Sequence, residues 1–193
     1  MQIKMTLLSD TILGNGISVP GAEDISVLCD ERGFPYMKGG TLKGIFREEL
    51  NNLLLWKGED SSQIKQTLHS LLGYLGDDSL LGERKLRFSD LTLSDNVKNT
   101  ILNEIKDNTD QIIELFSFIR IFTAIDKNGQ VEEGSLRSAR CLKSGLIFFG
   151  TIECFSEDEE LVSEALSLIK WVGTMRNRGF GQVGIEVIKE ESL

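Results

Sequence analysis

Hydrophobic and polar residues alternate near the start of the chain and again near its end. Ile3, Met5 and Leu7 follow the two-residue period of a strand with one buried face. Runs of apolar, β-branched and aromatic residues at 146–155 and 181–190 predict two further strands. We expect these three segments to lie in one sheet.

Apolar residues recur three or four positions apart in two longer segments. One runs from Leu42 to about Trp56 and predicts an amphipathic helix, which Thr41 is placed to cap. The other, at 157–175, begins with acidic residues, which suit the first turn of a helix. A shorter helix is expected from Ile64 to Leu75.

The middle of the chain has weaker patterns. Residues 85–93 alternate as a strand does, and the polar residues 94–109 predict a peripheral helix or an insertion. The apolar run at 111–126 becomes β-branched toward its end and leads into a turn at 127–130, which two extended arms flank. The order strand, helix, strands, helix, strand predicts an α+β fold with a ferredoxin-like antiparallel sheet and helices on one face.

Length and charge limit the possible classes of protein. The 193 residues, of which 40% are hydrophobic, suit a single domain with one core. The net charge of −9 argues against a wholly basic coat protein for nucleic acid, although it permits a local basic face. No apolar run is long enough to cross a membrane and the start lacks the pattern of a signal peptide, so we expect a cytoplasmic protein.

Cysteine and histidine offer little chemistry. The cysteines at positions 29, 141 and 154 form no CxxC pair, so buried thiols are expected rather than disulfides or a zinc site. His69 is the only histidine and lies among leucines. A histidine-based triad or a two-histidine metal site is therefore hard to build, and His69 is expected on a helix face.

The segment GGTLKGIFR at 39–47 is the first candidate site. Gly39 and Gly40 let the backbone approach a ligand, and the first-turn amides from Thr41 onward lack partners within the helix. Lys43 and Arg47 lie one helical turn apart. A phosphate would fit there, while the alternative is a basic edge that faces solvent.

A glycine-rich segment at 173–184 is the second candidate. Its GxGxxG pattern follows a predicted helix and precedes a predicted strand, which is the reverse of a dinucleotide-binding fingerprint. The alternative to a ligand-binding loop is a tight turn with its arginines in water. As a ligand-binding loop it would hold a phosphate backbone or a base through Arg176, Arg178, Gly179, Phe180 and Gly181.

Charge is segregated along the chain. No acidic residue occurs at 134–152, where Arg137 and Arg140 lie on a predicted extended arm and are candidates for binding RNA. Asp24 follows a glycine-rich loop at 14–21. Its carboxylate could serve as a general base, as a metal ligand, or only as a solvated loop acid.

Four segments, taken together and in this order, resemble signatures of the RAMP superfamily of CRISPR-associated proteins. The resemblance extends over nearly the whole chain and is greatest to the backbone subunit of type III effector complexes. The segments are PYMKGGTLKGIFR, LLGERKLRFSDLTL, RIFTAIDKNGQVEEGSLRSARCLKSGLIFFGTI and GTMRNRGFGQVGIEV.

The resemblance implies a single domain over 1–193 with an RRM-like palm, an insertion at about 57–110 and a β-hairpin thumb at about 123–143. It also implies partners, namely guide RNA, target RNA, stacked copies of the same chain and other CRISPR effector subunits, with no membrane. Guide phosphates would be bound by Lys43, Arg47 and the loop 176–181.

In the type III backbone subunits, a loop aspartate cleaves target RNA with a divalent metal. Alignment on the motif PYMKGGTLKG places Asp24 at that position, so the resemblance implies Asp24 as catalytic residue and ligand of a divalent metal, with Mg²⁺ expected. A scaffold subunit that binds RNA without cutting it is the alternative. A guide-processing nuclease of the same superfamily ranks lowest, because that branch relies on histidine.

Overall fold

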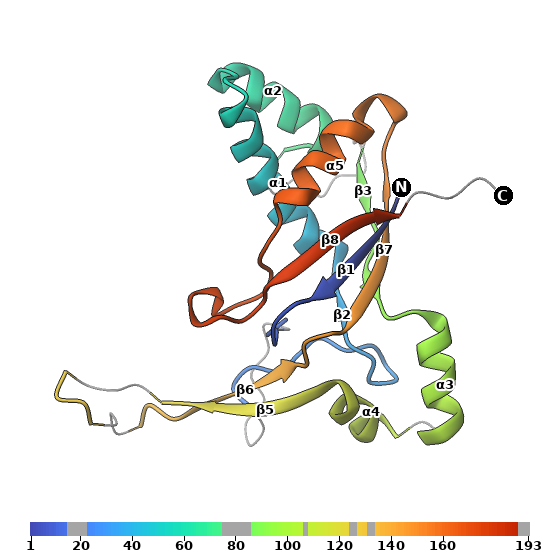
Figure 1. Ribbon diagram of the computed structural model, residues 1–193, viewed down its shortest axis with the longest axis vertical. Helices are drawn as coiled ribbons and strands as arrows, with labels where there is room; N and C mark the ends of the chain where they lie inside the picture. Colours follow the sequence, from blue (N-terminus) through green and yellow to red (C-terminus); the bar gives the residue numbers. More distant parts are fainter. Residues whose placement is uncertain (15–22, 75–85, 106–107, 124–126, 131–133, 189–193) are drawn as a thin grey trace.

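The computed structural model describes residues 1–14, 23–74, 86–105, 108–123, 127–130 and 134–188 (Figure 1). Within these residues, six strands form an antiparallel sheet in the order β2–β4–β7–β1–β8, and β3 also pairs with β7. The strands are β1 (Gln2–Leu7), β2 (Tyr36–Met37), β3 (Arg87–Phe88), β4 (Leu91–Thr92), β7 (Ile147–Glu153) and β8 (Val183–Ile188).

Two helices connect strands of the sheet and cover the same face of it. Helix α1 (Gly39–Trp56) follows β2, and α5 (Glu159–Leu168) joins β7 to β8. Both helices lie on one side of the sheet in Figure 1. With β1 between β7 and β8, this is the expected ferredoxin-like arrangement, and the predicted α+β fold class is confirmed.

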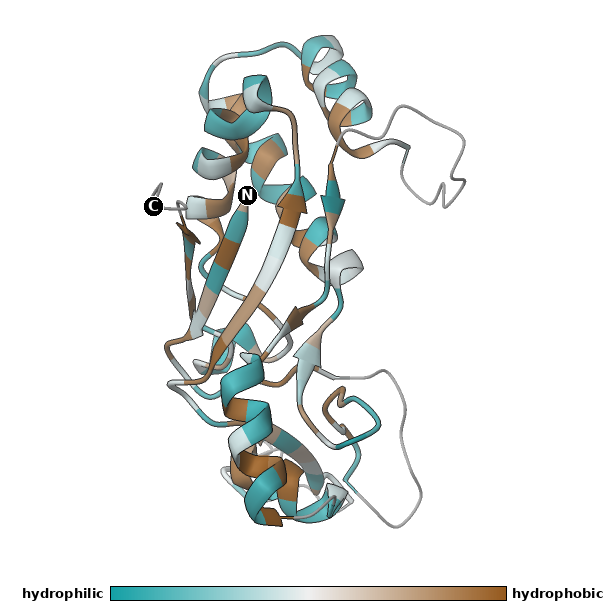
Figure 2. Cartoon of the chain, turned by 90° about the vertical axis from the view of Figure 1, so that its right-hand side faces the viewer, coloured by the Kyte–Doolittle hydropathy of each residue, from teal (hydrophilic) through white to brown (hydrophobic). Residues whose placement is uncertain are grey.

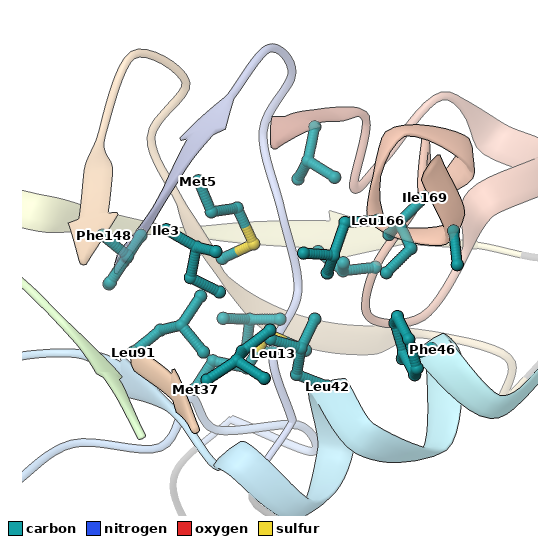
Figure 3. Packing of buried hydrophobic residues seen from close by; sticks show 14 of the residues in the cluster. Ile3, Met5, Leu13, Met37, Leu42, Phe46, Leu91, Phe148, Leu166 and Ile169 are labelled. Atoms are coloured by element: carbon teal, nitrogen blue, oxygen red, sulfur yellow. The ribbon is translucent and has the colours of Figure 1, made fainter. Parts of the chain in front are cut away.

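The main core fills the space between the sheet and these helices. Ile3 and Met5 of β1 are buried, as the alternation predicts, and they pack against the apolar stripe of α1, including Leu42 and Phe46 (Figure 3). Leu166 of α5 belongs to the same core. Figure 2, turned by 90° from Figure 1, shows the other face of the sheet, and among the described residues α1 and α5 do not cover this face.

Two predicted helices end earlier than expected. Helix α2 (Ser61–Leu72) begins with a capping box at Asp60 and ends at Gly73, where the backbone changes direction. Helix α5 ends at Leu168 because Trp171 already pairs in extended form with Gln182, next to the start of β8. Within the described residues, no helix combines the length and the apolar character that a membrane span requires.

The expected insertion at 57–110 contains more than added helices. It includes α2 and α3 (Asp95–Ile105), but β3 and β4 of the main sheet lie in the same range. Residues 75–85 and 106–107 of this range lie outside the described residues. Helix α4 (Thr109–Phe116) begins at the end of this range.

A two-stranded hairpin, β5 (Ser117–Phe122) with β6 (Arg137–Leu142), extends from the end of the molecule opposite α2 (Figure 1). The family resemblance implies a hairpin at about 123–143, and the first strand begins earlier, at Ser117. The buried hydroxyl of Ser117 donates to Ile113 O at 2.6 Å where helix α4 gives way to β5. Residues 124–126 and 131–133 of the expected hairpin lie outside the described residues.

Candidate nucleic-acid interface

A second, small hydrophobic cluster lies where the hairpin meets two loops. Its buried members are Ile12, Ala139, Cys141 and Phe180. Partly buried side chains from the hairpin, the glycine-rich loop and the segment next to Asp24 pack around it, namely Phe118, Phe122, Met175 and Ile25. The cluster therefore joins the segment next to Asp24, the hairpin and the glycine-rich loop, which are far apart in the sequence. We call it the site cluster.

The glycine-rich loop is held in place by its backbone. Gly181 has φ +83°, and a Cβ atom at this position would overlap the carbonyl oxygen of Val172. The Gly181 amide donates to Asp10 O at 2.9 Å, and Val172 N donates to Gly181 O at 2.8 Å. Gly179 shares the positive φ but has open space around it. The loop is thus a defined turn that needs glycine for a steric reason at 181.

Phe180 corrects one expectation from the sequence. Its side chain is only 4% exposed, and its ring packs at 70° to that of Phe122 with 5.7 Å between the centroids. The ring is a member of the site cluster and does not offer a face on which a base could stack. Because glycine flanks Phe180 on both sides, the sequence favours an exposed aromatic side chain in a loop.

Arg120 is a candidate that the sequence reasoning missed. Its guanidinium carbon lies 5.1 Å from the ring centroid of Phe180 and 5.9 Å from that of Phe122, while the residue stays exposed. The signal was present in the sequence, because the two-residue period of a strand puts Phe118, Arg120 and Phe122 on one face. Because apolar residues surround Arg120 in the sequence, the segment is typical of a buried strand and does not single out the arginine.

Three of the predicted arginines are exposed around the site cluster. Arg137 begins β6, while Arg176 and Arg178 lie in the short 3₁₀ turn of the glycine-rich loop. The Arg176 Nε atom donates to Gly173 O at 3.1 Å, which keeps this side chain close to its own turn. In Figure 1 the hairpin and this loop project from the same side of the molecule.

Arg140 pairs with an acidic residue of the chain itself. Its Nε atom lies 2.5 Å from Oε1 of Glu23, and the two side chains are 14% and 10% exposed. The hydrogen bond from Arg140 lowers the pKa of Glu23 below its ordinary value, more than burial raises it. Arg140 is therefore largely buried in an internal ion pair, and this internal role competes with its predicted role in binding RNA.

Asp24 is exposed and lies against the first residues of β6. Its Oδ2 atom accepts hydrogen bonds from the backbone N of Ser138 at 2.7 Å and from the Ser138 hydroxyl at 3.4 Å. The described residues contain no group of three or more histidine, cysteine or acidic side chains that could hold a metal ion. Mg²⁺ can nevertheless be bound by a single carboxylate of the protein when phosphates of the substrate and water molecules supply its other ligands.

The start of α1 differs from the predicted phosphate site. Lys38 occupies the N-cap position but its side chain makes no capping hydrogen bond, while Thr41 lies inside the first turn. The Gly39 amide donates to Asp90 Oδ1 at 2.8 Å. A Cβ atom at Gly39 would overlap the backbone at Phe88, so this glycine serves close packing against β3. The first amide of the helix thus binds an acid of the chain itself, while binding of RNA by Gly40, Thr41 and Lys43 stays a prediction.

Arg47 points toward the neighbouring helix. Its guanidinium donates to Leu72 O at 3.3 Å and to Gly73 O at 2.9 Å, the carbonyls at the end of α2. This contact stabilises the pairing of α1 with α2. The predicted role of Arg47 in binding a phosphate therefore competes with an internal role that the structure supports.

The histidine and the cysteines add no reactive centre to this region. His69 is exposed on α2, and its ring lies 3.8 Å from that of Tyr74 between centroids. The three cysteines are free, but only Cys141 is buried as predicted, while Cys29 and Cys154 are partly buried. Burial raises the pKa values of Cys29 and Cys141 to about 11, so both thiols stay protonated near neutral pH.

Comparison with known proteins decides the family. The model of the RAMP superfamily matches residues 4–184. The chain belongs to the RAMP superfamily. Among curated proteins, none matches it.

Solved structures agree with this RAMP assignment. The chain is similar to one in a cryo-electron microscopy structure of the type III-B Cmr-beta bound to cognate target RNA, with 16% identity, a TM-score of 0.66, and 96% of this chain and 95% of that chain covered. A chain of the apo Cmr-beta structure is similar too, with 15% identity, a TM-score of 0.68, and 98% and 97% covered. At this identity the likeness supports the shared fold.

Proposed function

We propose that this RAMP protein is an RNA-binding subunit of a type III CRISPR effector, and that it cleaves target RNA at Asp24. It would bind guide RNA beside copies of itself and other effector subunits. The Cmr-beta structure that it resembles is bound to target RNA. The observation that carries the proposal is the site cluster, which joins the segment next to Asp24, the hairpin and the glycine-rich loop.

The exposed cations around the site cluster support the binding of a phosphate backbone. Arg120, Arg137 and Arg178 come from both strands of the hairpin and from the loop, and all three are exposed. A local group of guanidinium groups can bind phosphates even though the whole chain has a net charge of −9. The overall negative charge weakens long-range attraction, which favours a subunit that binds RNA as part of an assembly.

The binding half of the proposal is tested by the salt dependence of guide affinity. Arg137→Ala should weaken binding and lower the slope of log K against log salt by about 0.7 for each phosphate of the single strand that the protein no longer neutralises. Arg87→Ala is the matched control, because Arg87 is exposed on β3 and its ion pair with Glu153, at 3.8 Å, is solvent-exposed. Equal slopes for wild type and Arg137→Ala would contradict the assignment.

The cleavage half of the proposal concerns the Asp24 carboxylate. Ser138 engages Oδ2, and this is the one hydrogen-bond partner of the carboxylate among the described residues. The other oxygen can accept a proton from a 2′-hydroxyl or a water, or bind a cation. Bound Mg²⁺ would supply Lewis-acid stabilisation of the charge that develops on the phosphate.

Asp24→Asn tests cleavage with little change of shape, because an amide oxygen can still accept from Ser138 N. We expect the assembly purified through this chain to cut guide-complementary RNA with Mg²⁺ at regular intervals, and the variant to bind RNA normally without cutting. Glu31→Gln, which neutralises another exposed acid, should cut at the wild-type rate. Equal cutting by Asp24→Asn would remove Asp24 from the mechanism.

One alternative is a scaffold subunit that binds RNA and does not cut it, and it would need no group of three or more metal-binding side chains, which the described residues do not contain. The same experiment separates the two functions. Guide and target binding without metal-dependent cuts in the wild-type assembly would identify the scaffold.

A further inference from the structure

Ile25 attaches the segment that carries Asp24 to the hairpin through a single β-bridge. Ile25 forms a parallel bridge with Ala139 of β6. Its N–H donates to Ser138 O at 3.2 Å, and its carbonyl accepts from Arg140 N at 2.9 Å. The backbone that carries Asp24 is therefore fixed to a strand more than a hundred residues further along the chain.

Asp24 itself contributes to this attachment. Its backbone N–H donates to the Ser138 hydroxyl at 3.3 Å, and its Oδ2 atom accepts from Ser138 N at 2.7 Å. Both bonds are at the surface, where water competes with them. Surface hydrogen bonds alone would hold the carboxylate weakly, so a stronger anchor is needed close by.

The ion pair between Glu23 and Arg140 is such an anchor. It lies next to Asp24 in the chain, is largely buried, and has 2.5 Å between Oε1 and Nε. Arg140 Nη1 also donates to the hydroxyl of Ser117 at 3.3 Å, and Ser117 is 3% exposed. Because loss of one partner would leave a buried charge without compensation, the pair fixes the segment in one register.

We propose that Glu23 and Arg140 are positioning residues for Asp24, because their ion pair holds residues 23–25 on β6 with the carboxylate exposed. This inference rests on the proposed function, since it assigns the pair a role in cleavage. The pair takes no part in the chemistry and does not contact RNA. Its loss should therefore lower the rate of cleavage while the affinity for guide RNA stays unchanged.

The experiment combines two readouts on the same variants, Glu23→Gln, Arg140→Met and the double variant. The first is amide hydrogen exchange in the purified chain, which should be about tenfold faster at Ile25 and unchanged in β1. The second is cleavage by the assembly at saturating RNA, which should be about tenfold to a hundredfold slower, as when a residue that orients a ligating group is lost. Guide affinity should stay within about twofold of wild type.

Two further comparisons separate positioning from general damage to the fold. Arg140→Lys keeps the charge but loses the planar fork, so its cleavage rate should lie between those of wild type and Arg140→Met. The double variant should cut no more slowly than the slower single variant, because the two changes remove one interaction. Glu31→Gln is the control for loss of one negative charge.

The possible failures are distinguishable. If Asp24→Asn abolishes cleavage while Glu23→Gln and Arg140→Met cut at the wild-type rate, the positioning role is overturned and the proposed function stands. Wild-type exchange at Ile25 in both variants overturns the anchor in the same way. If the wild-type assembly does not cut RNA, the nuclease function fails and the role of the pair in cleavage fails with it.

Discussion

The main core and the site cluster are built in different ways. The main core joins the buried faces of β1, β7, α1 and α5, whose side chains follow the periods of strand and helix. The site cluster takes Ile12 and Phe180 from loops and Ala139 and Cys141 from β6. Burial of apolar area thus stabilises the main core, whereas specific backbone contacts hold the segments of the site cluster together.

The difference explains how one small domain can carry an exposed site. The main core consists of buried apolar side chains, so its stability does not depend on the arginines and the acid around the site cluster. The site cluster is too small to order its loops by burial alone. It depends on left-handed glycines, on strand bridges and on one buried ion pair, and each of these can be removed by a single substitution.

Loss of a large side chain from the main core should have the greatest effect. Phe46 is fully buried, and its ring lies 5.3 Å from that of Phe88 between centroids. Phe46→Ala should lower the free energy of unfolding by about 3–5 kcal/mol. Trp56→Ala on the same helix should change it by less than about 0.5 kcal/mol, because Trp56 is 71% exposed. Urea denaturation measures the free energy of unfolding of both variants. A loss for Phe46→Ala as small as that for Trp56→Ala would show that α1 does not anchor the core.

A smaller effect is expected in the glycine-rich loop. Gly181→Ala should destabilise the chain by about 3 kcal/mol, because the positive φ is strained and the new Cβ meets Val172 O. Gly179→Ala has the same strain in open space and should cost about 1 kcal/mol. Thermal unfolding and exchange at the Gly181 amide measure the difference. Equal losses of stability in Gly181→Ala and Gly179→Ala would mean that the loop opens easily and that the contact with Val172 is weak.

The main core could be predicted from the sequence because its signals are local. The alternation of Ile3, Met5 and Leu7 predicts the buried face of β1, and the stripe from Leu42 to Leu54 predicts the buried face of α1. Both are confirmed. The cap of α1 was wrong, because the acceptor that satisfies the Gly39 amide is Asp90, a residue 51 positions away.

The candidate site was only partly predictable. The run without acidic residues at 134–152 predicts one basic arm with Arg137 and Arg140, although residues three apart on a strand lie on opposite faces. The partner that buries Arg140 is Glu23, 117 residues earlier, and no local pattern indicates that contact. Phe180 was wrongly expected to be accessible, because its burial depends on how the loop returns to the hairpin.

The smallest predicted effect concerns the pH dependence of the ion pair between Glu23 and Arg140. Arg140 holds the pKa of Glu23 below its ordinary value of 4.5, so the pair contributes stability above pH 4.5 and loses it as the pH falls through the lowered pKa. Glu23→Gln removes this contribution at every pH. The difference in free energy of unfolding between wild type and Glu23→Gln should therefore be constant near neutral pH and should shrink below pH 4.5. Urea denaturation from pH 7 to about pH 3 measures it, and a difference that grows toward low pH would contradict a stabilising pair.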